Sequence, residues 1–192
     1  MSQADPPRAV LDADIIYSRV LHDLMGRVAD DLRLLDLVWS EELLAEARRS
    51  LIGKKGLAEE VAVRWVDYLP RNFPTGATKI EEGTMQIDLD ALTDDPDDHH
   101  VCALAIASGA DYLFTHDRGY LRKGLQQHGI EVTAPDPFLT AAFEADHQEL
   151  LGVLERQASS WAGGQPIEEL LAAIERAGAP ELVGKARGQL GG

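Results

Sequence analysis

The fold is decided by residues 9–17, which read AVLDADIIY. The apolar run Ala9-Val10-Leu11 predicts a short buried strand, and the carboxylates of Asp12 and Asp14 follow it directly. In a parallel sheet, ligands bind at the carboxyl ends of the strands. We therefore expect a functional site at the point where this strand ends.

Further along the chain, strand patterns alternate with helical ones. Apolar and β-branched runs predict strands at residues 37–39, 111–115 and 130–133, and residues 87–89 fit either a strand or an irregular stretch. Apolar residues at helical spacing predict helices at residues 17–35, 41–52 (with Ser40 as N-cap), 57–68, 99–108 and 121–128. The alternation predicts an α/β fold with a central parallel sheet of four or five strands and helices on both sides.

The C-terminal part of the chain has a different pattern. From Phe138 onward there are no strand candidates, and helices are predicted at residues 137–160, 166–177 and 180–190. Shorter connections are expected at residues 70–76, as a loop, and at residues 93–98, as a turn rich in Asp. We therefore predict two parts, an α/β domain at residues 9–140 and a helical extension at residues 141–192.

The composition is that of an ordinary globular protein, with 45% hydrophobic and 27% charged residues in a chain of 192. Cys102 is the single cysteine, so it cannot form an internal disulfide, and its apolar surroundings suit a packing role in a reducing compartment. The chain begins without an apolar signal core, and no run approaches the roughly 20 apolar residues of a membrane helix. We expect a cytoplasmic protein with no membrane partner.

The net charge of −15 argues by itself against nucleic-acid binding, because affinity for a phosphate backbone comes largely from Lys and Arg. The distribution of charge is more informative. Residues 80–117 hold ten Asp or Glu and no Lys or Arg, whereas basic residues follow at Arg118, Arg122 and Lys123. These three either contact phosphates or only solvate a helix. Most of the acidic residues are expected to face solvent, and a few are candidates for binding a cation.

Four acidic residues stand at positions that the fold can bring together. Asp12 and Asp117 follow predicted strands, Asp98 precedes an apolar helix, and Glu46 lies on a helix that begins directly after a strand. Converging carboxylates suit Mg²⁺ or Mn²⁺, which prefer oxygen ligands and can activate water for phosphodiester hydrolysis. Close alternatives are Asp95 and Asp97 for Asp98, and Glu42 for Glu46. His99, His100 and His116 lack the spacing of a zinc site.

The same segments carry a resemblance to a known family. Residues 10–16 (VLDADII), 39–46 (WSEELLAE), 95–105 (DPDDHHVCALA) and 110–117 (ADYLFTHD) resemble, in order, the acid-bearing segments of the PIN domain, the fold of the VapC-like toxin ribonucleases and related nucleases. The resemblance runs from about residue 9 to about residue 140.

The resemblance implies a metal-dependent endoribonuclease in which Asp12, Glu46, Asp98 and Asp117 surround Mg²⁺ or Mn²⁺. Thr115 is then expected to steady a carboxylate or a water. Substrate contacts are expected from the neighbouring polar residues Asp14, Ser40, His116 and Arg118. A metal-activated water would attack an RNA phosphodiester in line, and the products would carry 5′-phosphate and 3′-hydroxyl ends. No acid follows Asp117 closely, which leaves a second metal position open.

Other functions compete with this one. Asp12-Ala13-Asp14 after a strand also resembles the acid pair of haloacid-dehalogenase-type phosphatases, but His116-Asp117-Arg118-Gly119 fits the later motifs of that family poorly. A non-catalytic interaction domain of the same fold is another alternative. If the enzyme is the toxin of a toxin–antitoxin pair, its acidic surface would suit a basic antitoxin protein. A homodimer also stays open.

Overall fold

The computed structural model describes residues 5–80 and 87–191. Within that part of the chain, a parallel sheet of four strands runs in the order β2-β1-β3-β4. These strands are β1 (Arg8–Leu11), β2 (Asp36–Val38), β3 (Tyr112–Phe114) and β4 (Glu131–Thr133). The α/β fold with a parallel central sheet is therefore confirmed.

The register places the ends of the two central strands side by side. Val10 is paired with Leu113 and Leu11 with Phe114, so Asp12 and Thr115 each come one residue after a paired position. Ala9, Val10 and Leu11 are at most 1% exposed because helices cover both faces of the sheet. This burial explains why β1 is an uninterrupted apolar run rather than an alternating pattern.

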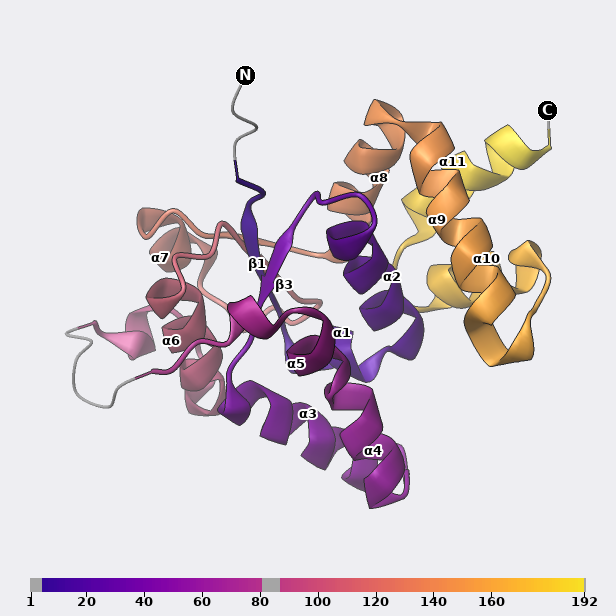
Figure 1. Ribbon diagram of the computed structural model, residues 1–192. Helices are drawn as coiled ribbons and strands as arrows, with labels where there is room; N and C mark the ends of the chain where they lie inside the picture. Colours follow the sequence, from indigo (N-terminus) through magenta and orange to yellow (C-terminus); the bar gives the residue numbers. More distant parts are fainter. Residues whose placement is uncertain (1–4, 81–86, 192) are drawn as a thin grey trace.

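Helices connect the strands and cover them on both sides. Figure 1 shows α6 and α7 on one side of the strands and α2 on the other. The connecting helices are α1 (Ala13–Tyr17), α2 (Arg19–Asp30), α3 (Glu41–Gly53), α4 (Glu59–Val66), α5 (Tyr68–Asn72), α6 (His99–Ala107) and α7 (Arg122–Gln127). Short 3₁₀ helices lie at η1 (Pro74–Gly76), η2 (Leu89–Ala91) and η3 (Pro96–Asp98).

The predicted helix at residues 17–35 is wrong in its bounds. The chain forms two helices that meet at Ser18, where the backbone is extended (φ −81°, ψ 98°), and the second of them ends at Asp30. Arg33 then takes a positive φ of 53°, which turns the chain toward β2. Apolar residues keep a helical spacing across the break, so the periodicity alone did not reveal it.

The predicted loop at residues 70–76 is instead largely helical, since it contains the end of α5 and all of η1. This segment passes directly along the edge of the sheet, where the backbone N–H of Trp39 donates to the carbonyl of Gly76 at 3.0 Å. A side chain at Gly76 would meet the Leu37 carbonyl, so glycine permits the close approach. Residues 87–89 contain no strand in the described part of the chain, and Leu89 begins η2.

The C-terminal helices gather beside α2 (Figure 1). They are α8 (Pro135–Ala145), α9 (His147–Ser160), α10 (Ile167–Arg176) and α11 (Pro180–Leu190), with η4 (Trp161–Gly163) after α9. The single helix predicted at residues 137–160 is wrong: Asp146 leaves the helical region (φ −150°, ψ 90°), and its carboxylate caps α9 by accepting from the Glu149 N–H at 3.1 Å.

Two buried polar side chains hold these helices in place. Gln157 on α9 is fully buried and donates to the Val20 carbonyl of α2 at 2.9 Å. Asp136 on α8 accepts from the backbone N–H groups of Glu181 (3.0 Å) and Leu182 (2.9 Å) at the start of α11. The predicted boundary between residues 140 and 141 falls inside α8, and the division into two domains stays a prediction. None of the described helices is long and apolar enough to cross a membrane.

Candidate active site

Asp12 is held at the end of β1 by groups from three segments of the chain. Its Oδ1 accepts from the Ala13 N–H at 2.6 Å, which caps α1. Its Oδ2 accepts from the hydroxyl of Thr115 at 2.7 Å, across the end of β3, and from the hydroxyl of Tyr120 at 3.1 Å. Asp12 is 5% exposed, so the orientation of its carboxyl group is fixed by these contacts rather than by water.

Burial and neighbouring acids make Asp12 hard to ionise. The pKa of Asp12 is raised from 3.8 to about 7, mainly by burial; the hydrogen bond from Thr115 opposes the shift, and the charge of Asp14 adds to it. The raised pKa means that burial, together with the nearby acids, outweighs the hydrogen bonds that stabilise the ionised carboxylate. Such a group is a candidate for binding a cation or for proton transfer.

Asp14 and His116 form a pair at the rim of the site. The Asp14 Oδ2 accepts from the backbone N–H of His116 at 3.0 Å and lies 3.0 Å from the Nδ1 of the same residue. The hydrogen bond to Asp14 is the main reason that the pKa of His116 is raised, so the ring favours its charged form. Asp14 is thereby partly neutralised by His116.

Asp117 follows β3 in a tight turn. Its backbone N–H donates to the Thr115 hydroxyl at 2.9 Å, and its Oδ1 accepts from the Gly119 N–H at 2.7 Å. The Thr115 hydroxyl therefore connects Asp12 to the backbone that carries Asp117. A single side chain thus holds two of the candidate acids in position.

Asp98 stands at the start of α6 without capping it. In the described structure its carboxylate accepts no capping hydrogen bond from that helix, and it lines the same cavity as Asp12 and Asp117 instead. Its pKa is raised to about 6, first by burial and then by the charges of Asp95, Asp117 and Glu46. Of the close alternatives, Asp97 is exposed and Asp95 caps η3 through the Asp97 N–H at 2.9 Å.

Glu46 reaches the same place from α3. Its Oε2 lies 3.1 Å from the Nε2 of His100, which is held on its other side by the Asp97 carbonyl at 2.7 Å from Nδ1. The contact with Glu46 is the main cause of the raised pKa of His100. The sequence pattern did not suggest this partnership, because it depends on how α3 packs against α6.

These residues line one pocket with a volume of about 290 Å³, which we call the acidic pocket. Its described lining consists of Asp12, Ala13, Asp14, Tyr17, Glu46, Ser50, Lys54, Asp98 and Asp117. Glu46 and Ser50 lie four residues apart on one face of α3, and Lys54, the residue that ends this helix, continues the same spacing. That spacing was visible in the sequence and would have identified Ser50 and Lys54.

A comparison with known protein families identifies the domain that contains these residues. A family model described as PIN domain matches residues 8–119, which is more than half of the chain. The chain belongs to the PIN domain family. No curated protein and no solved structure matches it at a significant level. PIN domains are generally nucleases that use divalent metal ions, so the chain belongs to a superfamily of nuclease type.

The PIN domain does not place every predicted residue in the pocket. Ser40 is fully buried, and its hydroxyl caps α3 by accepting from the Leu43 N–H at 3.3 Å, which leaves it no access to a substrate. Arg118 and His116 are exposed beside Asp117, outside the pocket lining. The sequence pattern did not indicate Tyr120. Its buried hydroxyl donates to Asp12 because the turn after β3 brings the two residues together.

The donor chemistry fits a hard divalent cation. Asp12, Glu46, Asp98 and Asp117 supply oxygen atoms in one pocket, and burial with mutual repulsion raises the pKa values of Asp12 and Asp98, so a bound cation would stabilise their ionised forms. As the side chains stand, no three His, Cys, Asp or Glu residues in the described part of the chain converge closely enough to hold an ion. These four side chains therefore suit a divalent cation in ligand type and charge, and binding of the cation would draw them closer together.

Proposed function

We propose that this PIN domain is a metal-dependent endoribonuclease that hydrolyses RNA phosphodiesters in the acidic pocket. The observation that carries the proposal is the meeting of Asp12, Glu46, Asp98 and Asp117, from four separate segments, in one pocket of about 290 Å³. The family assignment supports nuclease chemistry in general, and the resemblance to toxin ribonucleases favours RNA. The family assignment leaves the phosphatase alternative without support.

Several residues in and around the pocket have definite tasks in such a reaction. When bound, a divalent cation supplies an activated water and neutralises charge on the phosphate. Thr115 and Tyr120 hold Asp12 in one orientation, and His100 does the same for Glu46. The ammonium group of Lys54 is the basic side chain of the described lining, where it can contact a non-bridging phosphate oxygen. Asp14 is partly neutralised by His116 and contributes less negative charge at the rim.

The first experiment uses the full chain on a mixed structured RNA, with Mn²⁺, Mg²⁺ or excess chelator, and compares Asp98→Asn with Asp97→Asn. Asp97 is one residue away and exposed, so its variant removes the same charge outside the pocket. We expect metal-dependent cleavage that falls by about 10²-fold or more in Asp98→Asn and is retained in Asp97→Asn. The same digestion of a DNA strand of equal sequence tests the preference for RNA.

A second matched pair addresses Glu46. Glu46→Gln should lose activity, whereas Glu42→Gln, one turn earlier and exposed, should keep it. Equal loss in both members of a pair would contradict the assignment of the acidic pocket. Intact RNA with wild-type protein that still binds metal would favour the non-catalytic interaction domain.

We also propose that the nuclease acts as the toxin of a toxin–antitoxin pair, with a basic antitoxin segment entering the acidic pocket. The support is the net charge of −15 together with the cluster of carboxylates. Expression of the chain should arrest growth, expression of Asp98→Asn should not, and a small basic protein encoded beside it should restore growth. Unimpaired growth at full expression of an active nuclease would refute the toxin role.

A further inference from the structure

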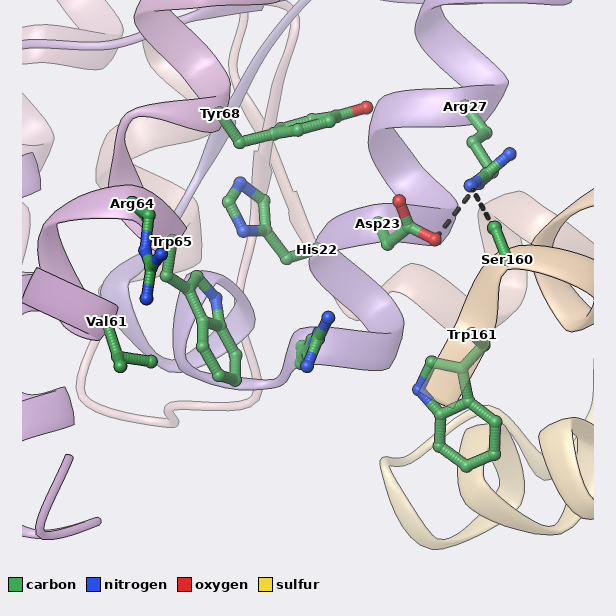
Figure 2. A pocket seen from close by; sticks show the side chains of 10 residues that line it. His22, Asp23, Arg27, Val61, Arg64, Trp65, Tyr68, Ser160 and Trp161 are labelled. Carbon is green, nitrogen blue, oxygen red and sulfur yellow. Dashed lines mark hydrogen bonds and ion pairs between the residues drawn. The ribbon is translucent and has the colours of Figure 1, made fainter. Parts of the chain in front are cut away.

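A second pocket of about 510 Å³ lies between α2, α4, α5 and the end of α9. Its volume is larger than that of the acidic pocket and falls within the roughly 300–1,000 Å³ of small-molecule sites. Figure 2 shows Arg64 and Trp65 on one side of it and Trp161 on the other. We call it the arginine pocket, because its described lining includes Arg19, Arg27 and Arg64.

The charge of the arginine pocket is opposite to that of the chain as a whole. Three arginines face a single carboxylate, Asp23, among its described lining residues. Arg27 is held by Asp23 at 3.0 Å and by the Ser160 hydroxyl at 2.7 Å (Figure 2). Within the described residues, Arg19 and Arg64 have no carboxylate within salt-bridge distance. In a protein of net charge −15, this pocket is suited to an anion.

Aromatic rings provide the rest of the wall. Trp65 is fixed by a hydrogen bond from its Nε1 to the Ile16 carbonyl at 2.9 Å, and the guanidinium of Arg19 lies 5.8 Å from its ring centre. Trp161 and Tyr68 also line the pocket. Flat π-faces beside guanidinium groups suit a ligand that joins a planar ring to an anionic group.

The wall also contains a buried polar group without a partner. His22 is 3% exposed, and its ring packs edge to face with that of Tyr68, with 5.1 Å between the ring centres. Its Nε2 makes no hydrogen bond to the described part of the chain. Burial lowers its pKa to about 4, so the ring is neutral at pH 7. An unpaired buried nitrogen costs free energy, and a polar ligand that reaches it would remove that cost.

Three side chains in contact link the arginine pocket to the acidic pocket, and we call Tyr17, Lys55 and Trp65 the ridge. Tyr17 lines the acidic pocket and Trp65 lines the arginine pocket. The Nζ of Lys55 lies between them, 4.3 Å from the ring centre of Tyr17 and 4.6 Å from that of Trp65. A strand that leaves the acidic pocket along this ridge meets a cation and aromatic faces before it reaches Arg19.

We propose that the arginine pocket binds a nucleotide, with its phosphate on Arg19 and Arg64 and its base against Trp65 or Trp161. The shared chemistry is a planar base joined to a phosphate, supplied either by an RNA strand or by a free mononucleotide. The ridge favours a nucleotide of the strand that is cut in the acidic pocket. That part of the inference rests on the proposed function, whereas nucleotide binding itself does not.

The test measures binding to the full-length chain in the Asp98→Asn background, so that RNA stays intact. The probes are adenosine 5′-monophosphate, followed by tryptophan fluorescence, and a labelled ten-nucleotide single-stranded RNA, followed by anisotropy. The double substitution Arg19→Gln with Arg64→Gln removes the proposed phosphate contacts. Both side chains are exposed, so the fold should survive, and circular dichroism checks this. Arg71→Gln on α5 removes the same kind of charge outside the pocket.

We expect the double variant to bind at least about tenfold more weakly, and Arg71→Gln to bind like the parent. If the double variant binds only the RNA more weakly, the pocket takes a nucleotide of the strand. If it also binds adenosine 5′-monophosphate more weakly, the pocket takes a free nucleotide. Unchanged binding in the double variant, or equal weakening in Arg71→Gln, overturns the inference. So does a polyglutamate peptide that displaces the RNA while adenosine 5′-monophosphate does not.

Cleavage assays separate this inference from the proposed function. In the chain with Asp98 intact, the double variant should raise KM for a long RNA by about tenfold with kcat little changed, because the arginines lie away from the reacting bond. If the wild type cuts no RNA yet the arginines bind nucleotide, the function fails and the inference stands. If the wild type cuts RNA and the double variant matches it in KM and in binding, the inference fails and the function stands.

Discussion

His116 Nδ1 lies 3.0 Å from Oδ2 of Asp14, and the opposite edge of the same ring lies against Gly178 in the turn between α10 and α11. A Cβ atom at Gly178 would come within 2.6 Å of the His116 Nε2. The C-terminal helices therefore touch the rim of the acidic pocket through this histidine. Their packing and the position of Asp14 are coupled.

This coupling predicts the effect of Gly178→Ala. The backbone at Gly178 has a φ of +104°, which an alanine adopts only with strain, and the added Cβ would displace His116. We expect a loss of about 1–3 kcal/mol in the free energy of unfolding and lower nuclease activity, because Asp14 loses its partner. Denaturant unfolding and RNA cleavage measure the two effects.

Gly184→Ala is the matched control, since Gly184 lies inside α11 with no neighbouring atom within 4 Å of the added Cβ. It should leave activity unchanged and stabilise the helix by about 0.5–1 kcal/mol. Wild-type stability and activity in Gly178→Ala would show that the C-terminal helices do not position His116.

The raised pKa values of Asp12 and Asp98 predict how stability depends on pH without metal. Both groups have an ordinary pKa near 3.8 and titrate in the folded chain at about 7 and about 6. Between these limits the folded state binds more protons than the unfolded state, so the free energy of unfolding falls as pH rises from about 4 to 7. Melting temperatures in chelator across that range should decline.

Asp12→Asn should remove much of this decline. An amide stays neutral, and the hydroxyls of Thr115 and Tyr120 can accept as well as donate, so the hydrogen bonds to residue 12 can be kept. At pH 8 in chelator we expect the variant to be more stable than wild type by up to about 4 kcal/mol, while its cleavage activity is lost. A variant less stable than wild type at that pH would mean that the carboxylate is stabilised in the fold.

The raised pKa values of Asp12 and Asp98 also predict how metal affinity depends on pH. Because the ligands must be deprotonated, Mn²⁺ binding should release protons from Asp12 and Asp98 and should strengthen by about tenfold or more between pH 5.5 and 7.5. Calorimetry in two buffers of different ionisation enthalpy counts the protons. Glu42→Gln should behave like wild type, and an affinity that is flat over this range would place the metal elsewhere.

The fold was largely predictable because burial imposes simple patterns on strands. Ala9-Val10-Leu11 is an uninterrupted apolar run because both faces of β1 are covered, and the acid that follows it had to lie at the edge where ligands bind. The helix breaks at Ser18 and Asp146 were not predictable from spacing, since apolar residues continue in phase across them. Both breaks depend on backbone conformation at one polar residue.

The candidate site was predictable to the extent that it follows from strand ends. Asp12 and Thr115 meet because β1 and β3 are neighbours in register, whereas the pairing of Glu46 with His100 depends on how α3 packs against α6. Packing between helices is set by many side chains together, so no short motif records it. The arginine pocket was not predictable from the sequence for the same reason, because its residues come from α2, α4, α5 and the end of α9.

Thr115 offers the most direct test of how the strand ends organise the site. Its hydroxyl donates to Asp12 and accepts from the Asp117 N–H, so Thr115→Val removes the shorter of the two hydroxyl donors to Asp12 Oδ2 and leaves the Asp117 N–H without this acceptor. We expect cleavage to fall by about 10- to 100-fold and stability by about 1–3 kcal/mol. Thr133→Val is the control, because Thr133 is the last residue of the neighbouring strand β4 and its hydroxyl makes a 3.4 Å contact with the Ala134 carbonyl. If the two valine variants have equal activity, the Thr115 hydroxyl serves packing of the strand end and does not position the acids.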